Sequence, residues 1–191
     1  MSQLILASSS PHRAGLLQRL GIPFIQVSPD VDESPLENEL PHDLAGRLAR
    51  EKAQAVATKH PTACLIGSDQ LAVFDNRILG KPGSRDNAVA QLSEFSNQVV
   101  QFLTSVAVIA NGQLLGHSVV EPRVAFRRLE QEEIVRYVET ENPIDCAGSF
   151  KAEALGVTLF ESLFSQDPTA IIGLPLIETC RLLRQAGYQL P

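Results

Sequence analysis

Asp69 is the residue whose chemical type fits its local sequence least. It lies in the segment 63–74, ACLIGSDQLAVF, an apolar run that Ser68, Asp69 and Gln70 interrupt. If this segment is a strand, alternate side chains share a face, and Asp69 lies on a face that is otherwise apolar. A carboxylate is costly to bury there unless it is paired, hydrogen-bonded or bound to a metal. Asp69 is therefore a candidate general base, and a turn at 67–69 capped by its own carboxylate is the alternative.

A serine-rich helix start supplies the first candidate phosphate site. The stretch LILASSSPHR at 4–13 places Ser8, Ser10 and Arg13 where a strand gives way to a helix. Unpaired backbone N–H groups and the helix dipole make such an end favourable for an anion, which Arg13 could bind with two hydrogen bonds. The alternative is plain serine capping beside a solvated arginine.

Two lysines are further candidates for phosphate binding. Lys52 falls within the apolar arc of its expected helix, at a mid-helix position where a lysine cannot easily reach water, although snorkelling is the alternative. Lys81 lies in the sequence Gly80-Lys81-Pro82, where the proline favours an extended lysine and the glycine allows backbone to approach a ligand. A simple surface turn is the alternative for Lys81.

An acidic segment supplies the second candidate carboxylate, Glu33. Residues 29–43 contain six carboxylates and no lysine or arginine. Carboxylates beside phosphate-binding cations indicate a hard divalent metal shared with the phosphates. A solvated acidic loop is the alternative, and it suffices for most of these six side chains.

The elements that must position these residues alternate along the chain. Hydrophobic periodicity, caps and turn residues predict the strands 4–7, 24–28 and 63–74 and the helices 11–20, 42–60, 84–95, 130–139 and 175–185. Two longer strands, 99–110 and 114–126, are expected to form a hairpin at Asn111-Gly112, and 146–160 is expected to mix strand and loop. This order predicts an α/β fold, or a mixed α+β fold, with a mixed sheet.

Composition excludes several classes of protein. The 191 residues carry a formal net charge of −6, which argues against nucleic-acid binding through a basic surface. The three cysteines form no CxxC pair, so neither a disulfide framework nor a zinc site is indicated and a reducing cytoplasm fits best. The N-terminus lacks the pattern of a signal peptide, and no segment is apolar enough to predict a membrane span.

Taken together and in order, these stretches resemble the Maf family of nucleotide pyrophosphatases. The resemblance extends over nearly the whole chain and includes LILASSSPHR, VDES, RLAREKA, IGSDQ, GKP, CAGSFKAEALG and GLPL. It implies one Maf-like domain over residues 1–191, with a long mixed sheet, flanking helices and two lobes around a central cleft. It also implies hydrolysis of a nucleoside triphosphate to the monophosphate and diphosphate, and the family suggests a homodimer.

The resemblance also implies roles for individual residues. Asp69 matches the catalytic base, and the sequence leaves open whether it is base, metal ligand or both. Glu33 is expected to share with Asp69 the binding of a divalent cation, Mg²⁺, Mn²⁺ or Co²⁺. The expected phosphate-binding residues are Ser8, Ser10, Arg13, Lys52 and Lys81.

Within the family, the chain is most similar to the subgroup that acts on 7-methyl-GTP. That subgroup has Gln after the catalytic Asp, here Gln70, and Glu in the SFKxE stretch, here Glu153; a carboxylate can accept from both N1–H and N2–H of guanine. The chain departs at His12, where the subgroup has Trp, so a smaller ring that can become charged is expected to stack on the base; a solvated His12 away from the base is the alternative. The alternatives are a dTTP/UTP pyrophosphatase and a nucleotide-binding cell-division regulator.

Overall fold

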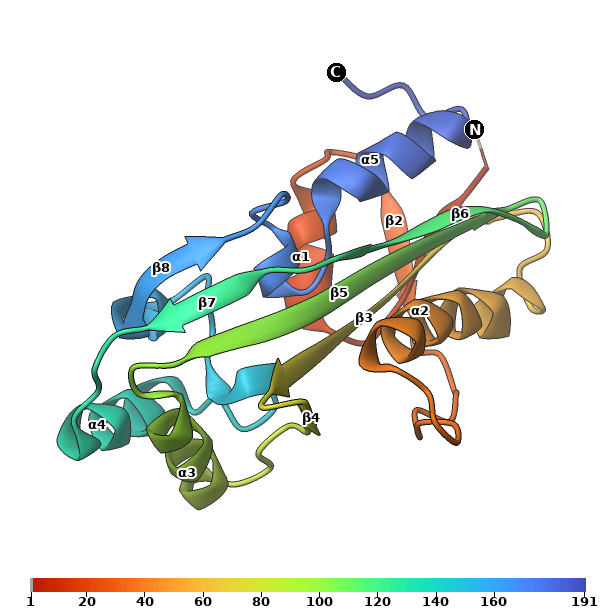
Figure 1. The fold of residues 1–191 in the computed structure, drawn as a ribbon. Coiled ribbons are helices and arrows are strands. Elements are labelled where there is room, and N and C mark those ends of the chain that lie inside the picture. Colours follow the sequence, from red (N-terminus) through yellow and green to blue (C-terminus); the bar gives the residue numbers. More distant parts are fainter. Residues whose placement is uncertain (1) are drawn as a thin grey trace. The chain divides into compact units, whose positions relative to one another are not determined.

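The computed structural model describes residues 2–191 (Figure 1). The strands are β1 Leu4–Ala7, β2 Phe24–Val27, β3 Cys64–Phe74, β4 Arg77–Leu79, β5 Val99–Ala110, β6 Gln113–Val120, β7 Arg123–Phe126 and β8 Phe160–Phe164. The α-helices are α1 Pro11–Gln18, α2 Pro41–Ala57, α3 Arg85–Phe95, α4 Gln131–Glu141 and α5 Leu176–Gln185. Short 3₁₀ helices are η1 Ala147–Ser149, η2 Leu155–Leu159 and η3 Ala170–Ile172.

The strands form one mixed sheet of eight strands. Its order is β2-β1-β3-β5-β7-β8, with β4 paired to β3 and β6 paired to β5. Strand β1 is parallel to both β2 and β3, whereas β4, β6, β7 and β8 pair in antiparallel fashion. This mixed sheet with flanking helices confirms the expected fold class.

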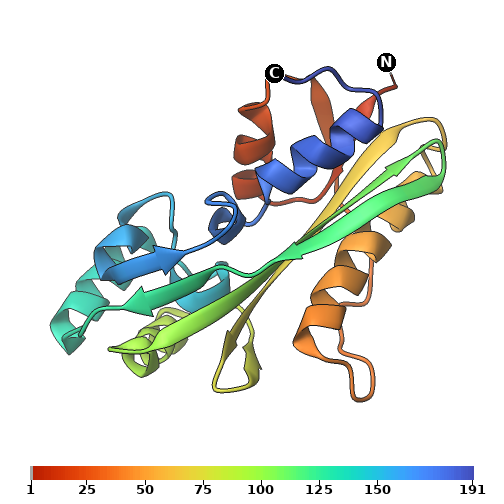
Figure 2. The same ribbon diagram turned by 45° about the horizontal axis from the view of Figure 1, so that its top comes forward.

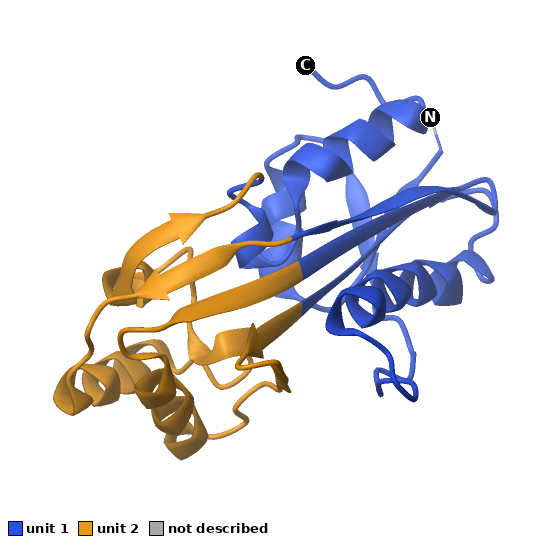
Figure 3. Ribbon diagram, viewed as in Figure 1, with its two compact units in different colours: residues 1–70, 104–120, 167–191 blue, residues 71–103, 121–166 orange. Residues whose placement is uncertain are grey.

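The chain divides into two compact units, coloured separately in Figure 3. Unit 1 contains residues 1–70, 104–120 and 167–191, and unit 2 contains residues 71–103 and 121–166. No helix within residues 2–191 is long and apolar enough to cross a membrane.

In unit 1, the two faces of the sheet carry different helices (Figure 2). One hydrophobic cluster joins Leu6 and Ile66 to residues of α1 and α5, such as Leu17 and Leu182. Leu65 belongs to a second cluster with residues of α2. Consecutive residues of β3 therefore face opposite helices, as the strand repeat requires.

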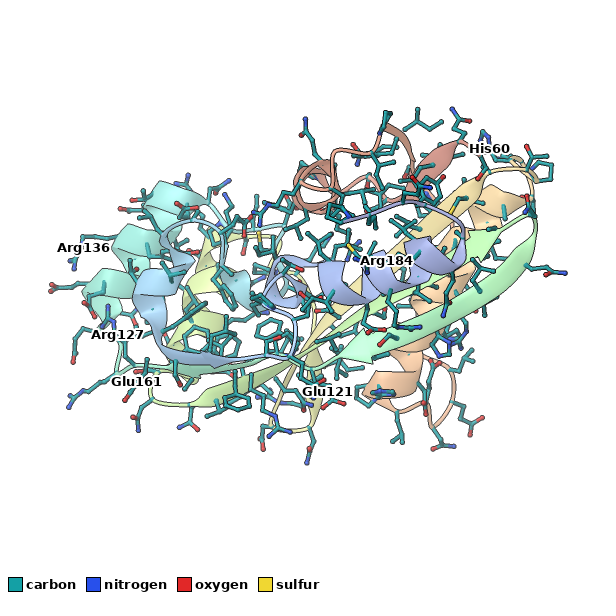
Figure 4. All side chains as sticks on the ribbon, turned by 90° about the horizontal axis from the view of Figure 1, so that it is seen from above. His60, Glu121, Arg127, Arg136, Glu161 and Arg184 are labelled. Carbon is teal, nitrogen blue, oxygen red and sulfur yellow. The ribbon has the colours of Figure 1, made fainter. Side chains whose placement is uncertain are left out.

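Unit 2 is built on aromatic packing. Its ring contacts link β7, β8 and α3 and involve Phe74, Phe95, Phe102, Phe126, Phe150 and Phe160. Helices α3 and α4 pack against each other (Figure 1). Exposed charged side chains occupy outer faces of the helices, as Arg136 on α4 shows, and Arg184 does the same on α5 of unit 1 (Figure 4).

Strand β3 runs without interruption from Cys64 to Phe74, so the alternative of a turn at 67–69 is wrong. The expected hairpin turn is confirmed, because Asn111 and Gly112 both have positive φ, at 50° and 75°.

Two other expectations about strands hold only in part. The expected strand 114–126 is two strands, β6 and β7, that pair with different parts of β5. Pro122 lies between them and has no N–H to donate, although its carbonyl still accepts from Phe102 N of β5. Most of 146–160 forms turns of 3₁₀ helix rather than strand, and β8 begins only at Phe160.

Candidate active site

Asp69 lies on the face of β3 that packs against α2. Helix and strand approach unusually closely at Gly67, where an added Cβ would lie 2.1 Å from Ala49 O and 2.7 Å from Ala53 N. The same turn of α2 carries Lys52, whose Nζ donates to Asp69 Oδ1 over 2.6 Å. Both side chains are buried, with only 5% of each residue exposed. Lys52 and Asp69 therefore form a buried ion pair, and Gly67 allows the helix and the strand to approach closely enough to form it.

Glu33 is a second carboxylate paired with Lys52. Its Oε1 is 2.6 Å from Lys52 Nζ, although 61% of the Glu33 side chain is exposed. Lys52 therefore does not snorkel to solvent but lies between the two carboxylates that the sequence singled out. Lys52 therefore brings the Glu33 and Asp69 carboxylates to the same ammonium group.

The opposite face of β3 binds a turn that sequence reasoning missed. Ser68 Oγ donates to Gly173 O over 2.9 Å. The Gln70 amide nitrogen donates to Ala170 O at 3.0 Å, Ile171 O at 3.1 Å and Thr104 Oγ1 at 3.0 Å. These bonds occupy both hydrogens of the amide nitrogen, so the structure gives Gln70 an anchoring role in addition to its predicted role in specificity.

The same turn orients Arg13. Its Nε donates to Gly173 O over 2.9 Å, and Nη1 is 3.4 Å from Ser8 Oγ. Ser10 caps α1, accepting from Arg13 N, so the serine-capping alternative is correct for Ser10. The alternative of a solvated arginine is wrong, because Arg13 is half-buried. Burial lowers the pKa of its guanidinium, while the charges of Asp69 and Glu33 raise this pKa. Arg13 thus shares the electrostatic field of both carboxylates.

Glu33 and Asp69 fit a hard divalent cation of the expected kind. Among residues 2–191, no group of three or more His, Cys, Asp or Glu side chains could hold a metal by itself. Mg²⁺-like ions commonly take one or two protein carboxylates, keeping waters and substrate phosphates as their other ligands. The carboxylates of Glu33 and Asp69 match the protein part of that ligand set.

The remaining predicted residues are divided between the two units. His12 is half-buried in the first turn of α1, in unit 1. Lys81 and Glu153 are exposed and belong to unit 2. Burial raises the pKa of the Cys146 thiol there; Glu153 adds to this effect and Lys81 opposes it, so both lie close enough to act on one group.

Comparison with known proteins gives a consistent result. A family model described as "Maf-like protein" matches residues 3–186. A relative from Aromatoleum aromaticum, named 7-methyl-GTP pyrophosphatase, is 53% identical over 192 residues, covering 100% of this chain and 98% of its own. A relative of the same name from Xanthomonas oryzae pv. oryzae is 51% identical over 191 residues, covering 100% of both chains.

A solved structure supports the fold alone. The chain is similar to a HAM1 protein from Coxiella burnetii with a TM-score of 0.52 and 15% sequence identity. The similarity covers 97% of this chain and 100% of that one. At this identity, the similarity carries an argument about architecture and none about substrate.

Proposed function

The chain belongs to the Maf family, and from this premise we propose that it hydrolyses 7-methyl-GTP to 7-methyl-GMP and diphosphate, removing modified nucleotides. The proposal depends mainly on the buried Asp69 carboxylate, which Lys52 holds beside Glu33. The full-length relatives named 7-methyl-GTP pyrophosphatase supply the choice of nucleotide.

In the proposed mechanism, Asp69 acts as the general base. It accepts a proton from a water molecule, whose oxygen forms a bond to the α-phosphorus while the bond from this phosphorus to the bridging oxygen breaks. Diphosphate leaves, and the monophosphate keeps the new oxygen. Arg13 and Lys52 stabilise the negative charge that develops on the phosphates. The backbone N–H groups at the start of α1 donate to the phosphate oxygens.

A divalent cation, Mg²⁺, Mn²⁺ or Co²⁺, is the proposed cofactor, with Glu33 and Asp69 as its protein ligands. When bound, it would neutralise phosphate charge. Lys52 pairs with both carboxylates and offsets one of their two negative charges, so it holds together the two groups that would bind the cation.

Hydrolysis of a nucleotide panel tests this function directly. We expect 7-methyl-GTP to be the best substrate, with diphosphate rather than orthophosphate as the first product and with turnover lost on addition of EDTA. Product identity is measured by ion chromatography of single-turnover samples. Release of orthophosphate without metal would contradict the proposal, because the phosphates would then lie in another register.

Substitution of Glu153 tests the choice of base. Glu153→Gln should lower kcat/KM for 7-methyl-GTP more than for UTP or dTTP, because a carboxylate accepts two donors from guanine and an amide offers one acceptor and an unwanted donor. Losing a charge-assisted hydrogen bond costs about 1.5–3 kcal/mol, or roughly 10- to 150-fold. Equal losses on all nucleotides would assign Glu153 to structure or catalysis instead.

Two further functions remain as outcomes of the same panel. Preference for dTTP and UTP would identify the other subgroup, against which Gln70 and Glu153 argue. Turnover far below a kcat/KM of about 10⁴ M⁻¹s⁻¹ on every nucleotide would favour a nucleotide-binding regulator. We also propose a cytoplasmic location, consistent with the free cysteines Cys64, Cys146 and Cys180, and a homodimer; nucleic acid and membranes are not proposed partners.

A further inference from the structure

Glu33 reaches the site from a segment without helix or strand. Between β2 and α2, residues 28–40 form an irregular loop that is mostly exposed. Glu33 nevertheless lies 2.6 Å from the buried Lys52 amine. An exposed loop samples many conformations unless specific bonds hold it, so bonds that hold this loop in addition to the Glu33–Lys52 ion pair bear on the position of Glu33.

Arg47, on the second turn of α2, supplies such bonds. Its Nε and Nη2 donate to Glu39 Oε1 and Oε2 over 2.7 and 2.9 Å, the two parallel bonds that a guanidinium forms with a carboxylate. Nη2 also donates to the backbone oxygen of Ser34 over 2.9 Å, one residue beyond Glu33. One side chain of the helix thus fixes both ends of the segment 34–39.

Bonds within the loop extend this anchor toward Glu33. Glu39 Oε2 accepts from Leu36 N over 2.9 Å, and Asp32 Oδ1 accepts from Ser34 N over 2.9 Å. The Glu39 side chain is only 9% exposed and that of Arg47 15%, so this pair is shielded from water, unlike most surface ion pairs. Of the six acidic residues at 29–43, Glu39 is the one that forms the two-bond pair with Arg47.

Hydrogen bonds and nearby charges favour the ionised forms of Arg47 and Glu39. Glu51, one turn further along α2, accepts from Arg47 Nη1 over 2.9 Å. The hydrogen bonds from Arg47 and then from Leu36 N lower the pKa of Glu39 to about 2, with Arg50 adding a smaller effect. The carboxylate of Glu39 is therefore charged throughout the pH range in which an enzyme of this kind is assayed.

We propose that Arg47 and Glu39 are positioning residues that hold the loop so that Glu33 faces Lys52 and Asp69, and that they thereby set the affinity of the site for a divalent cation. The part concerning the cation rests on the proposed function, whereas the part concerning the loop does not. Arg47 and Glu39 are proposed to act through Glu33 and not by contacting the substrate.

A pH series tests the pair by itself. Glu39→Gln should lower Tm relative to the unmodified protein. A carboxylate with a lowered pKa stabilises the fold fully above its unfolded value, near 4.5, and loses this contribution as pH falls toward about 2. The difference in Tm between the two proteins should therefore be constant above pH 5 and shrink as the pH is lowered further. A difference that grows on acidification would contradict the assignment.

Arg47→Lys is the main test, because lysine keeps the charge but cannot form the two-bond fork. We expect faster amide hydrogen exchange in residues 32–39 and a dissociation constant for Mn²⁺, measured by electron paramagnetic resonance, that rises roughly 10- to 100-fold, as is typical when the support of a metal ligand is lost. Arg77→Lys is the matched control, since Arg77 pairs with Glu94 on an exposed surface of unit 2. It should change neither measurement.

A double-mutant cycle decides whether Arg47 acts through Glu33. In a Glu33→Gln background, Arg47→Lys should weaken Mn²⁺ binding no further, because the ligand that it positions is already lost. Additive losses would overturn the proposal, as would unchanged exchange in residues 32–39 or unchanged Mn²⁺ binding in the single Arg47→Lys variant. A protein that shows these binding effects but hydrolyses no nucleotide would contradict the proposed function and leave the positioning role intact.

Discussion

Asp69→Asn should reduce kcat/KM for 7-methyl-GTP by about 10²–10⁴-fold, the usual loss when a general base is removed. The amide has the same shape and can still accept the hydrogen bond from Lys52 Nζ that Asp69 Oδ1 accepts. It cannot take a proton from water, so the chemical step is lost while the packing of β3 against α2 is kept. Steady-state kinetics at saturating metal, with nucleotide binding measured by calorimetry, separate these two effects.

Asp75→Asn is the matched control for this substitution. Asp75 lies in the exposed turn between β3 and β4 with a φ of 50°, a conformation that Asn adopts as readily as Asp. The kcat/KM of the Asp75→Asn variant should stay within about twofold of that of the unmodified protein, since surface substitutions of this kind are close to neutral. If Asp69→Asn retains a near-normal kcat, Asp69 has no part in the proton transfer.

Gly67→Ala should cause a large loss of stability. The new Cβ would lie 2.1 Å from Ala49 O and 2.7 Å from Ala53 N, both backbone atoms of α2. No rotamer change relieves a clash with backbone, so the helix must move away from the strand. Overpacking a core typically costs about 1–3 kcal/mol, and we expect a loss of at least about 3 kcal/mol at this position, visible as a fall in Tm of roughly 6–12 °C.

The same displacement would separate Lys52 from Asp69, because one stretch of α2 carries both the contact with Gly67 and the lysine. Activity should therefore fall even at temperatures at which the variant is folded. Gly15→Ala in α1 is the control: nothing lies within 4 Å of its added Cβ, and alanine should stabilise the helix by about 0.5–1 kcal/mol. An unchanged Tm in Gly67→Ala would contradict the close packing of α2 against β3 at this position.

Sequence reasoning reached the parts of the site that local repeats control. The two-residue repeat of a strand was enough to place Asp69 on an apolar face, and the helical repeat was enough to turn Lys52 inward; the structure brings the two together at 2.6 Å. The hairpin at Asn111-Gly112 was predictable for the same reason, since both residues favour the positive φ that the turn requires. The order of the motifs along the chain indicated the Maf family.

The tertiary structure decided what depends on contacts between distant residues. Gly173 O accepts from Arg13 and from Ser68, across 160 and 105 positions of sequence, and no periodicity predicts which carbonyl a packed turn will present. The same holds for Glu39, which Arg47 distinguishes from the other acids of its loop only because α2 lies beside it. Propensity and periodicity are properties of a few consecutive residues, whereas hydrogen-bond partners are chosen by packing, which satisfies buried polar groups wherever the chain brings donor and acceptor together.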